Sequence, residues 1–406
     1  MLRTPLLDEL REEYEPLLDK IAAGTVAREL SGELPIEPVR WLKEAGFGAL
    51  RVPERHGGRG VSWPELGQLW IDVAAADANL AQALRGHFAL VEDRVWHHRL
   101  AGGQERWFAR FVAGEIAGNA WSETGPTAMG DQQTVLVEDE EGLRLEGEKF
   151  YTTGTTYAEW ADVLARRVDS GAEGEASYVV AIVDTRQAGV RCRDDWTGFG
   201  QRGTGSGTTV FEAARVDADD VLAFEDRFPY QTAVYQLNLL ATLAGIARAA
   251  TADAVAAVRA RERNFSHANT ARVRDDPQVL AVIGEIASAA YLAEAATLRV
   301  ATAVQEVADL ADAAAETIAA ANEVAEIEVA QAQVLVTRLV VAATSDLFDT
   351  LGASATARSR ALDRHWRNAR TVASHNPRIL KARVVGDHLV NGAPPPYAWG
   401  VGRTER

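Results

Sequence analysis

The chain contains little cysteine and little lysine, and it lacks a long uninterrupted apolar run. Cys192 is the single cysteine among 406 residues, which excludes an intrachain disulfide and a metal site built on several cysteines. No uninterrupted run reaches the roughly 18 apolar residues of a membrane span, and no basic-then-apolar signal begins the chain. Lysine occurs only at positions 20, 43, 149 and 381 while arginine is abundant, which we interpret as compositional bias. We therefore expect a soluble cytoplasmic protein with no membrane partner.

The balance of charges argues against a polyanionic partner. The formal net charge is -16 at pH 7, which disfavours nucleic acid or an anionic membrane as the main partner. The hydrophobic share of 47% and the charged share of 25% are typical of globular proteins. At about 100–200 residues per domain, the length suggests two or three domains.

The spacing of apolar residues predicts helices, then strands, then helices again. Residues 1 to about 115 and residues 230 to 349 have helical spacing, and residues 120 to 224 have the alternation of strands. We therefore predict an α+β, mainly α fold with three domains: an N-terminal helical domain (1–118), a middle antiparallel β-domain (119–226) and a C-terminal helical bundle (227–406).

The C-terminal bundle has one clear helix start and one very long helical stretch. Asp276 is typical of an N-cap, and Pro277 suits the first helical turn. The region from about Leu310 to Leu351 contains no Gly or Pro, and as one helix it would be on the order of 60 Å long. Such a helix exceeds what one subunit of this size readily covers, so we expect an oligomer built on helical bundles.

The stretch 361–377 crowds two histidines, three arginines and a tryptophan together. Arg364, Arg367 and Arg370 recur at every third residue, so on a helix they spread around one side. On periodicity alone, the ordinary interpretation is a solvated helix end that carries basic residues near its C-terminus. A functional interpretation depends on the rest of the chain.

Several segments together resemble the acyl-CoA dehydrogenase superfamily over nearly the whole length. Residues 34–48 and 52–60 resemble its N-terminal helix and loop, and residues 121–125 and 149–154 resemble the β-domain segments that pack on the flavin ring. These motifs are specific together and weak singly. The resemblance implies the same succession of helical domain, β-domain and helical bundle, assembled as a homotetramer that is a dimer of dimers.

Two departures from the family's pattern change the implied chemistry. The resemblance puts Asn376, with His375 beside it, where a dehydrogenase carries its catalytic glutamate, and an amide cannot accept a proton at neutral pH. The family's dinucleotide-binding pattern reads here as Asp349 to Ala353, and a carboxylate near a pyrophosphate would repel it by roughly a kcal/mol or more. That favours FMN over FAD.

Both departures point to one branch of the superfamily. Residues 195–209, 362–371 and 375–377 resemble the dibenzothiophene monooxygenases and sulfur-acquisition oxidoreductases, which are two-component flavin monooxygenases. The resemblance implies that reduced FMN, supplied in trans by a separate NAD(P)H-flavin reductase, reacts with O2 to give a C4a-hydroperoxyflavin. The implied substrate is a small heteroaromatic, organosulfur or amine compound.

The resemblance also implies roles for individual residues. His375, His87, Asn119 and Thr152 correspond to catalytic positions near the flavin and its oxygen adduct, and histidine suits the first two because its proton affinity lies near neutrality. An aromatic platform and a guanidinium suit the ring and the phosphate of FMN. The implied cofactor-binding residues are Trp196, Thr197, Arg263, Ser122, Thr153, Ser206, Gly352 and Asn376. The arginines of 361–377 then become mainly structural.

Two further motifs carry no site of their own. Gly198–Gly203 matches G-x-G-x-x-G by letter, but that motif needs a helix after it, and Thr208–Phe211 is typical of a strand. Without a nicotinamide site the chain is not expected to reduce its own flavin, which independently indicates a reductase partner. Trp96–His98 lacks carboxylate or cysteine neighbours at ligand spacing, so we expect no metal there.

Two other functions stay open at the level of sequence. One is an acyl-CoA dehydrogenase whose catalytic base is displaced, and the other is a flavin-less binding protein on the same fold. A third uncertainty concerns the pocket wall, because the branch often has a tyrosine four residues after the N-terminal histidine, where this chain has Val91. A different substrate would explain that difference.

Overall fold

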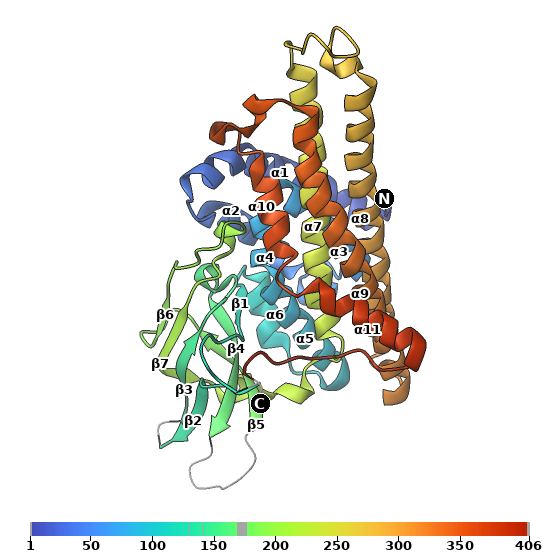
Figure 1. Ribbon diagram of the computed structural model, residues 1–406. Coiled ribbons are helices and arrows are strands. Elements are labelled where there is room, and N and C mark those ends of the chain that lie inside the picture. The colour runs from blue at the N-terminus through green and yellow to red at the C-terminus, as the bar shows by residue number, and fades with distance from the viewer. Residues whose placement is uncertain (1, 129, 141, 169–176, 404–406) are drawn as a thin grey trace.

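The computed structural model describes residues 2–128, 130–140, 142–168 and 177–403. It consists of N-terminal helices, a sheet and a long helical bundle (Figure 1). The N-terminal helices are α1 (Pro5–Ser31), α2 (Ile36–Glu44), α3 (Trp63–Ala76), α4 (Ala78–Ala83), α5 (Arg85–Ala101) and α6 (Glu105–Val112). This order of elements is the one that the sequence predicts.

Local signals explain where the N-terminal helices begin and end. The Thr4 side chain accepts a hydrogen bond from the backbone N–H of Leu7 at the start of α1, and Gly32 ends that helix in the left-handed conformation. A capping box formed by Ser62 and Glu65 starts α3. α3 then runs through the core, where Trp63 and several of its other side chains are fully buried.

The middle domain is a mixed sheet. Its strands are β1 (Ala117–Ala120), β2 (Val135–Asp139), β3 (Gly142–Lys149), β4 (Trp160–Val168), β5 (Ser177–Asp184), β6 (Val190–Cys192), β7 (Thr209–Val216) and β8 (Val221–Ala223). The expected β2–β3 hairpin is present, although residue 141 in its turn lies outside the described residues. β1 and β2 both pair with β4 in parallel, so the expectation of a wholly antiparallel domain was wrong.

The bundle contains α7 (Gln231–Ala260), α8 (Pro277–Ala308), α9 (Ala315–Asp346), α10 (Asp363–Val372) and α11 (Arg378–Asn391). Asp276 caps α8 as predicted, since its side chain accepts from the backbone N–H of Gln278. The predicted helix of about 60 Å is shorter, because the α8–α9 turn occupies residues 309–314 without a Gly or Pro to mark it. α9 has 32 residues and is about 48 Å long.

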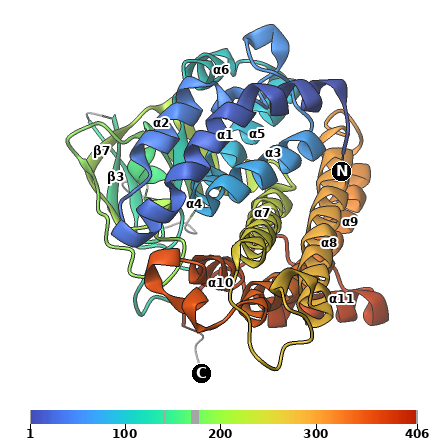
Figure 2. The ribbon, with the colours of Figure 1, turned by 90° about the horizontal axis from the view of Figure 1, so that it is seen from above.

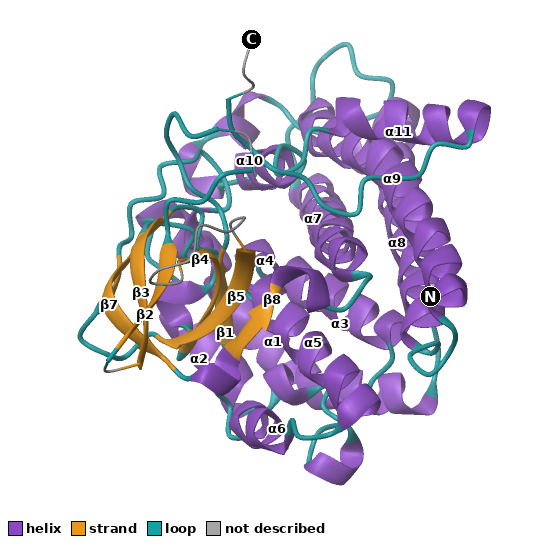
Figure 3. Cartoon of the chain, turned by 90° about the horizontal axis from the view of Figure 1, so that it is seen from below, coloured by secondary structure: helices purple, strands orange, loops and turns teal. Residues whose placement is uncertain are grey.

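α7 is the central helix of the molecule. Seen from above, it lies between the N-terminal helices and the α8–α9 pair (Figure 2). Seen from below, the strands gather on one side of these helices (Figure 3). The first turns of α7 therefore lie near all three parts of the chain.

Three helices are long and apolar enough to cross a membrane by length and composition: α7, α8, and α9 with its extension to Thr350. α7 and α9 bury more than half of their apolar windows inside the protein, whereas α8 leaves most of its window exposed. Leu280, Tyr291 and Leu292 are exposed on α8, and Tyr291 is 74% exposed. α8 thus presents an uncovered apolar face.

Candidate functional site

A cavity of about 160 Å³ lies where the three parts of the chain meet. Its wall comes from the start of α5, the end of β1 and the segment after it, the start of α7, the α10–α11 junction and the C-terminal tail. The lining residues are Arg85, Asn119, Trp121, Ser122, Phe224, Gln231, Thr232, Tyr235, Gln236, His375, Asn376, Ala398 and Trp399. Four of the predicted site residues, Asn119, Ser122, His375 and Asn376, are among them.

The basic residues of α10 anchor this helix to its neighbours. His365 Nε2 and Arg364 Nη2 both contact Asp253 Oδ2 of α7, at 2.8 and 2.6 Å. Asn368 Oδ1 accepts a hydrogen bond of 2.6 Å from the backbone N–H of Gln201 in the β-domain. These bonds hold the end of α10, and with it the junction that carries His375, against both the bundle and the sheet.

The loop that contains Trp196 packs directly on α10. The ring of Phe199 stacks on Trp366 with centroids 5.7 Å apart, and Arg367 Nη1 donates to the carbonyl of Phe199 at 3.0 Å. Gly200 leaves no room for a side chain, because an added Cβ would collide with the carbonyl oxygen of Arg367. Trp196 Nε1 donates to the carbonyl of Gly200 at 3.2 Å. Two segments far apart in the sequence are thereby brought together.

His375 lies at the cavity wall as a neutral imidazole. The imidazole is exposed to solvent at the mouth of the cavity, and the nearby positive charge of Arg85 disfavours its protonation, so that the pKa of His375 lies below its ordinary value. At neutral pH the ring offers one N–H donor and one acceptor nitrogen rather than a positive charge.

Asn376 belongs to a hydrogen-bonded row of amides. Its Nδ2 donates to Gln236 Oε1 of α7 at 2.9 Å, and the same oxygen accepts from Gln333 Nε2 of α9. Gln236 and Gln333 are both buried. The row fastens the α10–α11 junction to the core of the bundle.

Four polar side chains on the cavity wall have atoms without a hydrogen-bond partner among the described residues. These atoms are Arg85 Nε, Asn119 Oδ1, Gln231 Oε1 and the hydroxyl of Tyr235. Arg85, Asn119 and Tyr235 are buried, at 5%, 8% and 8% exposure. Buried polar atoms are usually paired, so four unpaired ones around one cavity indicate a site for a polar ligand.

The segment after β1 is fixed by a buried ion pair. Lys149 Nζ contacts Glu123 Oε1 at 2.6 Å, and Glu123 also accepts from the backbone N–H groups of Gln133 and Thr134. Ser122 forms a β-bridge with Phe150 one residue away. The two segments that resemble the flavin-contacting parts of the family therefore lie side by side.

Thr152, Thr153 and Ser206 form one buried cluster beside these segments. The hydroxyl of Thr152 donates to the carbonyl of Gly207 and contacts the hydroxyl of Thr209, both at 2.8 Å. The hydroxyls of Thr153 and Ser206 contact each other at 2.8 Å. The side chain of Thr152 is therefore occupied within the β-domain, and its predicted contact with an oxygen adduct stays a prediction.

An aromatic pair lies at the outer edge of this cluster. Tyr151 has a φ of 59° and lies edge-on to Trp196 with ring centroids 5.8 Å apart. Tyr151 is 46% exposed and Trp196 is half-buried. Thr197 is exposed beside them. An exposed aromatic pair next to a non-glycine residue in the left-handed region is typical of a ligand-contacting site.

His87 does not line the cavity. Its Nε2 lies 2.8 Å from the carbonyl oxygen of Gly48, and its Nδ1 accepts from the backbone N–H of Ala117 at 3.2 Å. Burial lowers the pKa of His87 to about 4, so the ring is neutral. Its predicted catalytic contact stays a prediction and requires one of these bonds to break.

Sequence reasoning overlooked Arg85, two positions before His87 on α5. The signal was an arginine inside an otherwise apolar stretch, from Leu80 to Val91, that contains few other charges. Sequence reasoning also overlooked Tyr235 and Gln236. The sequence of α7 predicts a buried face, but it does not indicate which helical turn lines a cavity.

Arg263 and Gly352 lie at the far end of the bundle from the cavity. Gly352 is next to Arg261, whose Nε donates to the carbonyl of Arg263 at 3.0 Å, and the side chain of Arg263 is exposed. From Gln236 to the end of α7 the helix rises by about 36 Å. Within one chain, these two residues cannot contact a ligand held at the cavity.

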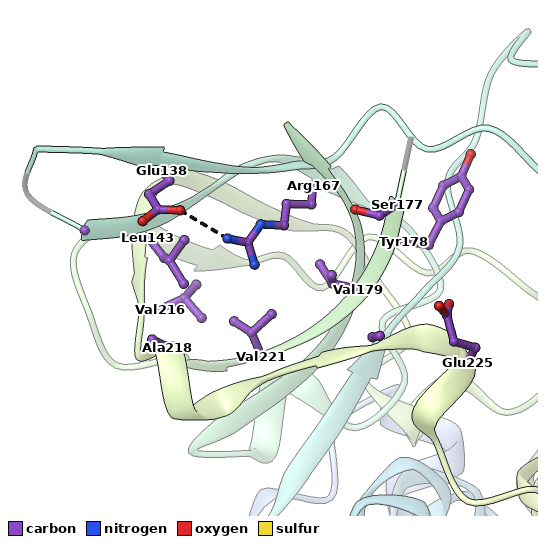
Figure 4. A pocket seen from close by; sticks show the side chains of 12 residues that line it. Glu138, Leu143, Arg167, Ser177, Tyr178, Val179, Val216, Ala218, Val221 and Glu225 are labelled. Atoms are coloured by element: carbon purple, nitrogen blue, oxygen red, sulfur yellow. Dashed lines mark hydrogen bonds and ion pairs between the residues drawn. The ribbon is translucent and has the colours of Figure 1, made fainter. Parts of the chain in front are cut away.

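A larger cavity of about 510 Å³ lies in the β-domain (Figure 4). None of the predicted site residues lines it, and two of its charged residues, Glu138 and Arg167, pair with each other at 3.1 Å. Elsewhere in the part of the chain that the structure describes, no group of three or more His, Cys, Asp or Glu could hold a metal ion. Another cavity, of about 480 Å³ between α1 and α3, also contains none of the predicted site residues. The cavity of about 160 Å³ is the candidate active site because four of them line it.

Family models match nearly the whole chain. The acyl-CoA dehydrogenase N-terminal domain matches residues 2–115, the middle domain matches residues 120–214, and the C-terminal domain matches residues 238–377. The three domains occur in the family's order. Their extents coincide with the N-terminal helices, most of the sheet and most of the bundle.

Relatives with named activities cover more than nine-tenths of the chain. Dibenzothiophene monooxygenase of Rhodococcus qingshengii is 28% identical over 398 residues, which are 93% of this chain and 92% of the relative. The probable FMNH2-dependent monooxygenase SfnC of Pseudomonas putida is 26% identical, covering 93% and 94%.

Solved structures give the same result. TdsC of Paenibacillus sp. A11-2 in complex with FMN and indole is 28% identical with a TM-score of 0.85, covering 95% of this chain and 98% of the other. Methanesulfinate monooxygenase MsuC of Pseudomonas fluorescens is 27% identical with a TM-score of 0.84, covering 98% and 99%.

Proposed function

Because the chain belongs to the acyl-CoA dehydrogenase superfamily, we propose that it is the oxygenase of a two-component flavin-dependent monooxygenase system. Its similarity to dibenzothiophene monooxygenase, SfnC, TdsC and MsuC supports this function. In the net reaction, one oxygen atom of O2 enters a small-molecule substrate and the other leaves as water. The two electrons come from reduced FMN, which a separate NAD(P)H-flavin reductase supplies in the cytoplasm.

One observation separates this function from that of a dehydrogenase. None of the described residues that line the cavity is Asp or Glu, and the catalytic glutamate of a dehydrogenase is replaced by Asn376. Removing the α-proton of a thioester needs a general base. The amide of Asn376 cannot serve, and the lowered pKa of His375 makes its imidazole a weak base.

The residues present fit a flavin. FMN is supported by the FMN-bound structure of TdsC and by the FMNH2 dependence of SfnC. When bound, reduced FMN supplies the electrons that activate O2. We assign the ring to the surface formed by Tyr151, Trp196 and the segments around Ser122 and Thr153, where an exposed aromatic pair and buried hydroxyls lie together.

His375 and Asn119 are the proposed catalytic groups on the cavity wall. A neutral His375 donates one N–H to a reacting oxygen and holds that proton at a fixed position, because α10 and the amide row anchor its segment. Asn119 also lines the cavity, and its Oδ1 has no hydrogen-bond partner among the described residues. Trp121, Trp399 and Phe224 supply the apolar part of the cavity wall.

A homotetramer, arranged as a dimer of dimers, is the proposed assembly. The exposed apolar face of α8 supports it, because such a face is stable in water when another copy of the chain covers it. Assembly also gives Arg263 and Gly352 a role, since only the flavin of a second subunit lies within their possible reach. In this proposal Arg263 binds the FMN phosphate across that interface.

The decisive experiment supplies the protein with a flavin reductase, NADH, FMN and ¹⁸O2, and then follows ¹⁸O in organosulfur and heteroaromatic products by mass spectrometry. Incorporation of one labelled atom that requires both proteins supports the proposal. Anaerobic bleaching of a bound flavin by an acyl-CoA would instead establish a dehydrogenase. A melting temperature that FMN leaves unchanged, together with no labelled product, would establish a flavin-less binding protein.

A further inference from the structure

Arg85 is a buried cation without an anionic partner. It lies at the start of α5, is 5% exposed and lines the cavity, and the described residues provide it with no ion pair or hydrogen bond. Its partner among the described residues is the ring of Tyr235, whose centroid lies 5.1 Å from the guanidinium carbon. Burial lowers the pKa of Arg85 to about 10, so the side chain is still positively charged at neutral pH.

The two carboxylates that act on the neighbouring Tyr235, Asp93 and Asp162, pair with other cations. Asp93 contacts Arg94 at 2.6 Å and Arg227 at 3.4 Å. Asp162 contacts Arg227 at 2.9 Å and also accepts from Trp121 Nε1 at 2.7 Å. A buried charge is stable when an opposite charge and hydrogen bonds compensate it, and these two acids already serve that purpose elsewhere.

The other groups on the wall also suit an anion. The ring of Tyr235 packs against Arg85, and the Tyr235 hydroxyl has no hydrogen-bond partner among the described residues, so it is a second donor for an anion at this wall. His375 is neutral and can donate an N–H without competing for the negative charge. A guanidinium donates two parallel hydrogen bonds to a planar or pyramidal oxyanion, which makes it selective for carboxylate and sulfur oxyacid groups.

The cavity provides space for a small group beside the charge. Its volume is about 160 Å³, and a cavity of about 150 Å³ in another protein accommodates a molecule of the size of benzene. The space suits a small acid, with its oxyanion at Arg85 and a short apolar part against Phe224 and Trp399.

We propose that the substrate of this enzyme is a small organic oxyanion, a carboxylate or a sulfur oxyacid, and that Arg85 and Tyr235 bind its charged group. This inference rests on the proposed monooxygenase function and adds to it the substrate class. Arg85 would then determine substrate specificity, although it belongs to no recognised sequence motif.

The test measures binding rather than turnover. Isothermal titration calorimetry is carried out on the protein loaded with oxidised FMN, using two matched pairs of probes: methanesulfinate against dimethyl sulfoxide, and propionate against propionamide. Each pair has nearly the same shape and differs in charge. We expect at least one anion to bind at least tenfold more tightly than its neutral match, and the pair that shows the difference identifies sulfinate or carboxylate as the preferred group.

Variants then assign the effect to Arg85. Arg85→Met should abolish the preference for the anion while the affinity for the neutral probe stays within twofold, and Arg85→Lys should restore part of it. Tyr235→Phe should lower the affinity for the anion by a smaller factor. This variant tests the site even if Arg85→Met fails to fold. Arg383→Met, on the exposed side of α11, is the matched control and should change nothing.

Two results would overturn the inference. The first is equal affinity for charged and neutral probes in the unaltered protein. The second is a loss of FMN affinity in Arg85→Met with an unchanged anion preference, which would make Arg85 a cofactor contact. Both can occur while ¹⁸O incorporation into a neutral substrate succeeds, so failure of this inference is distinguishable from failure of the proposed function.

Discussion

Asn376 donates its side-chain amide to Gln236 Oε1 at 2.9 Å, and this bond ties the segment that bears His375 to the central helix of the bundle. The same oxygen accepts from Gln333, so the α10–α11 turn and α9 both bond to one acceptor on α7. A residue that replaces a catalytic carboxylate in the family's pattern has thus become a structural link beside the site.

Replacing Asn376 with Ala should therefore reduce the share of consumed NADH that yields product, while FMN binding changes little. Loss of one hydrogen bond costs about 1 kcal/mol of folding stability and lets His375 move. We expect a several-fold larger share of the consumed NADH to appear as hydrogen peroxide rather than product, with FMN affinity nearly unchanged. Asn391→Ala, which removes an exposed amide bonded to Asp387, is the control. An unchanged ratio of peroxide to product would contradict the positioning role.

Replacing His375 with Ala should lower the rate of product formation by about 100-fold, the lower end of what a positioned proton donor contributes. His375→Gln keeps an N–H donor and should recover part of that loss. Because the pKa of His375 is lowered, its titration should not appear in the rate between pH 6.5 and 8. Steady-state rates across that range check both points, and a rate that follows an imidazole near pH 6.5 would contradict the neutral ring.

Acid should destabilise the fold partly through His87. Its pKa is about 4 in the folded protein and about 6.5 when unfolded, so below pH 6.5 the unfolded state binds more protons. The stability linked to this group is therefore complete above pH 6.5 and decreases as the pH falls toward 4, by about 3 kcal/mol in total. Urea unfolding at several pH values measures it. His87→Gln should have a shallower pH dependence than the unaltered protein, and equal slopes would contradict the assignment.

Charge on the exposed face of α8 should prevent assembly. Tyr291→Glu combined with Leu280→Glu places two carboxylates on an apolar surface that we expect another copy to cover. Light scattering coupled to size-exclusion chromatography should show a species smaller than that of the unaltered protein. Leu30→Glu alters an exposed leucine of α1 and serves as the control. Identical masses for all three proteins would exclude α8 from the interface.

Arg263→Ala should weaken FMN binding by about tenfold, which corresponds to the loss of a charge-assisted contact of about 1.4 kcal/mol. Fluorescence quenching of FMN measures the affinity. Arg261→Ala is the comparison, because Arg261 lies beside Gly352 and stacks near the ring of Phe265. A larger effect of Arg261 than of Arg263 would transfer the phosphate contact to it.

Local signals predicted much of the fold. The Asp276–Pro277 cap and the alternation on either side of residues 139–142 each act within a few residues, and both correspond to observed elements. The parallel pairing of β1 with β4 depends on contacts between strands about 40 residues apart, which no local pattern encodes. The α8–α9 turn was missed because alanine-rich sequence favours helix on both sides of it.

The sequence predicted only those residues of the candidate site that stand in motifs. His375 and Asn376 stand in a motif, and the structure places both on the cavity. Arg85 has no motif, since what distinguishes it is a missing partner, and only the three-dimensional arrangement of Asp93 and Asp162 reveals that. The bonds of His87 to backbone atoms are equally invisible in a sequence.

The burial of Lys149 against Glu123 has a practical consequence for handling this protein. Lys381 is also buried and Lys43 pairs with Glu159 at 2.5 Å, which leaves Lys20 as the exposed lysine among the described residues. Lys20 lies on α1, over the ring of Trp41, and does not line the cavity. Among the described lysine side chains, amine-reactive dyes will therefore attach mainly at Lys20, away from the cavity.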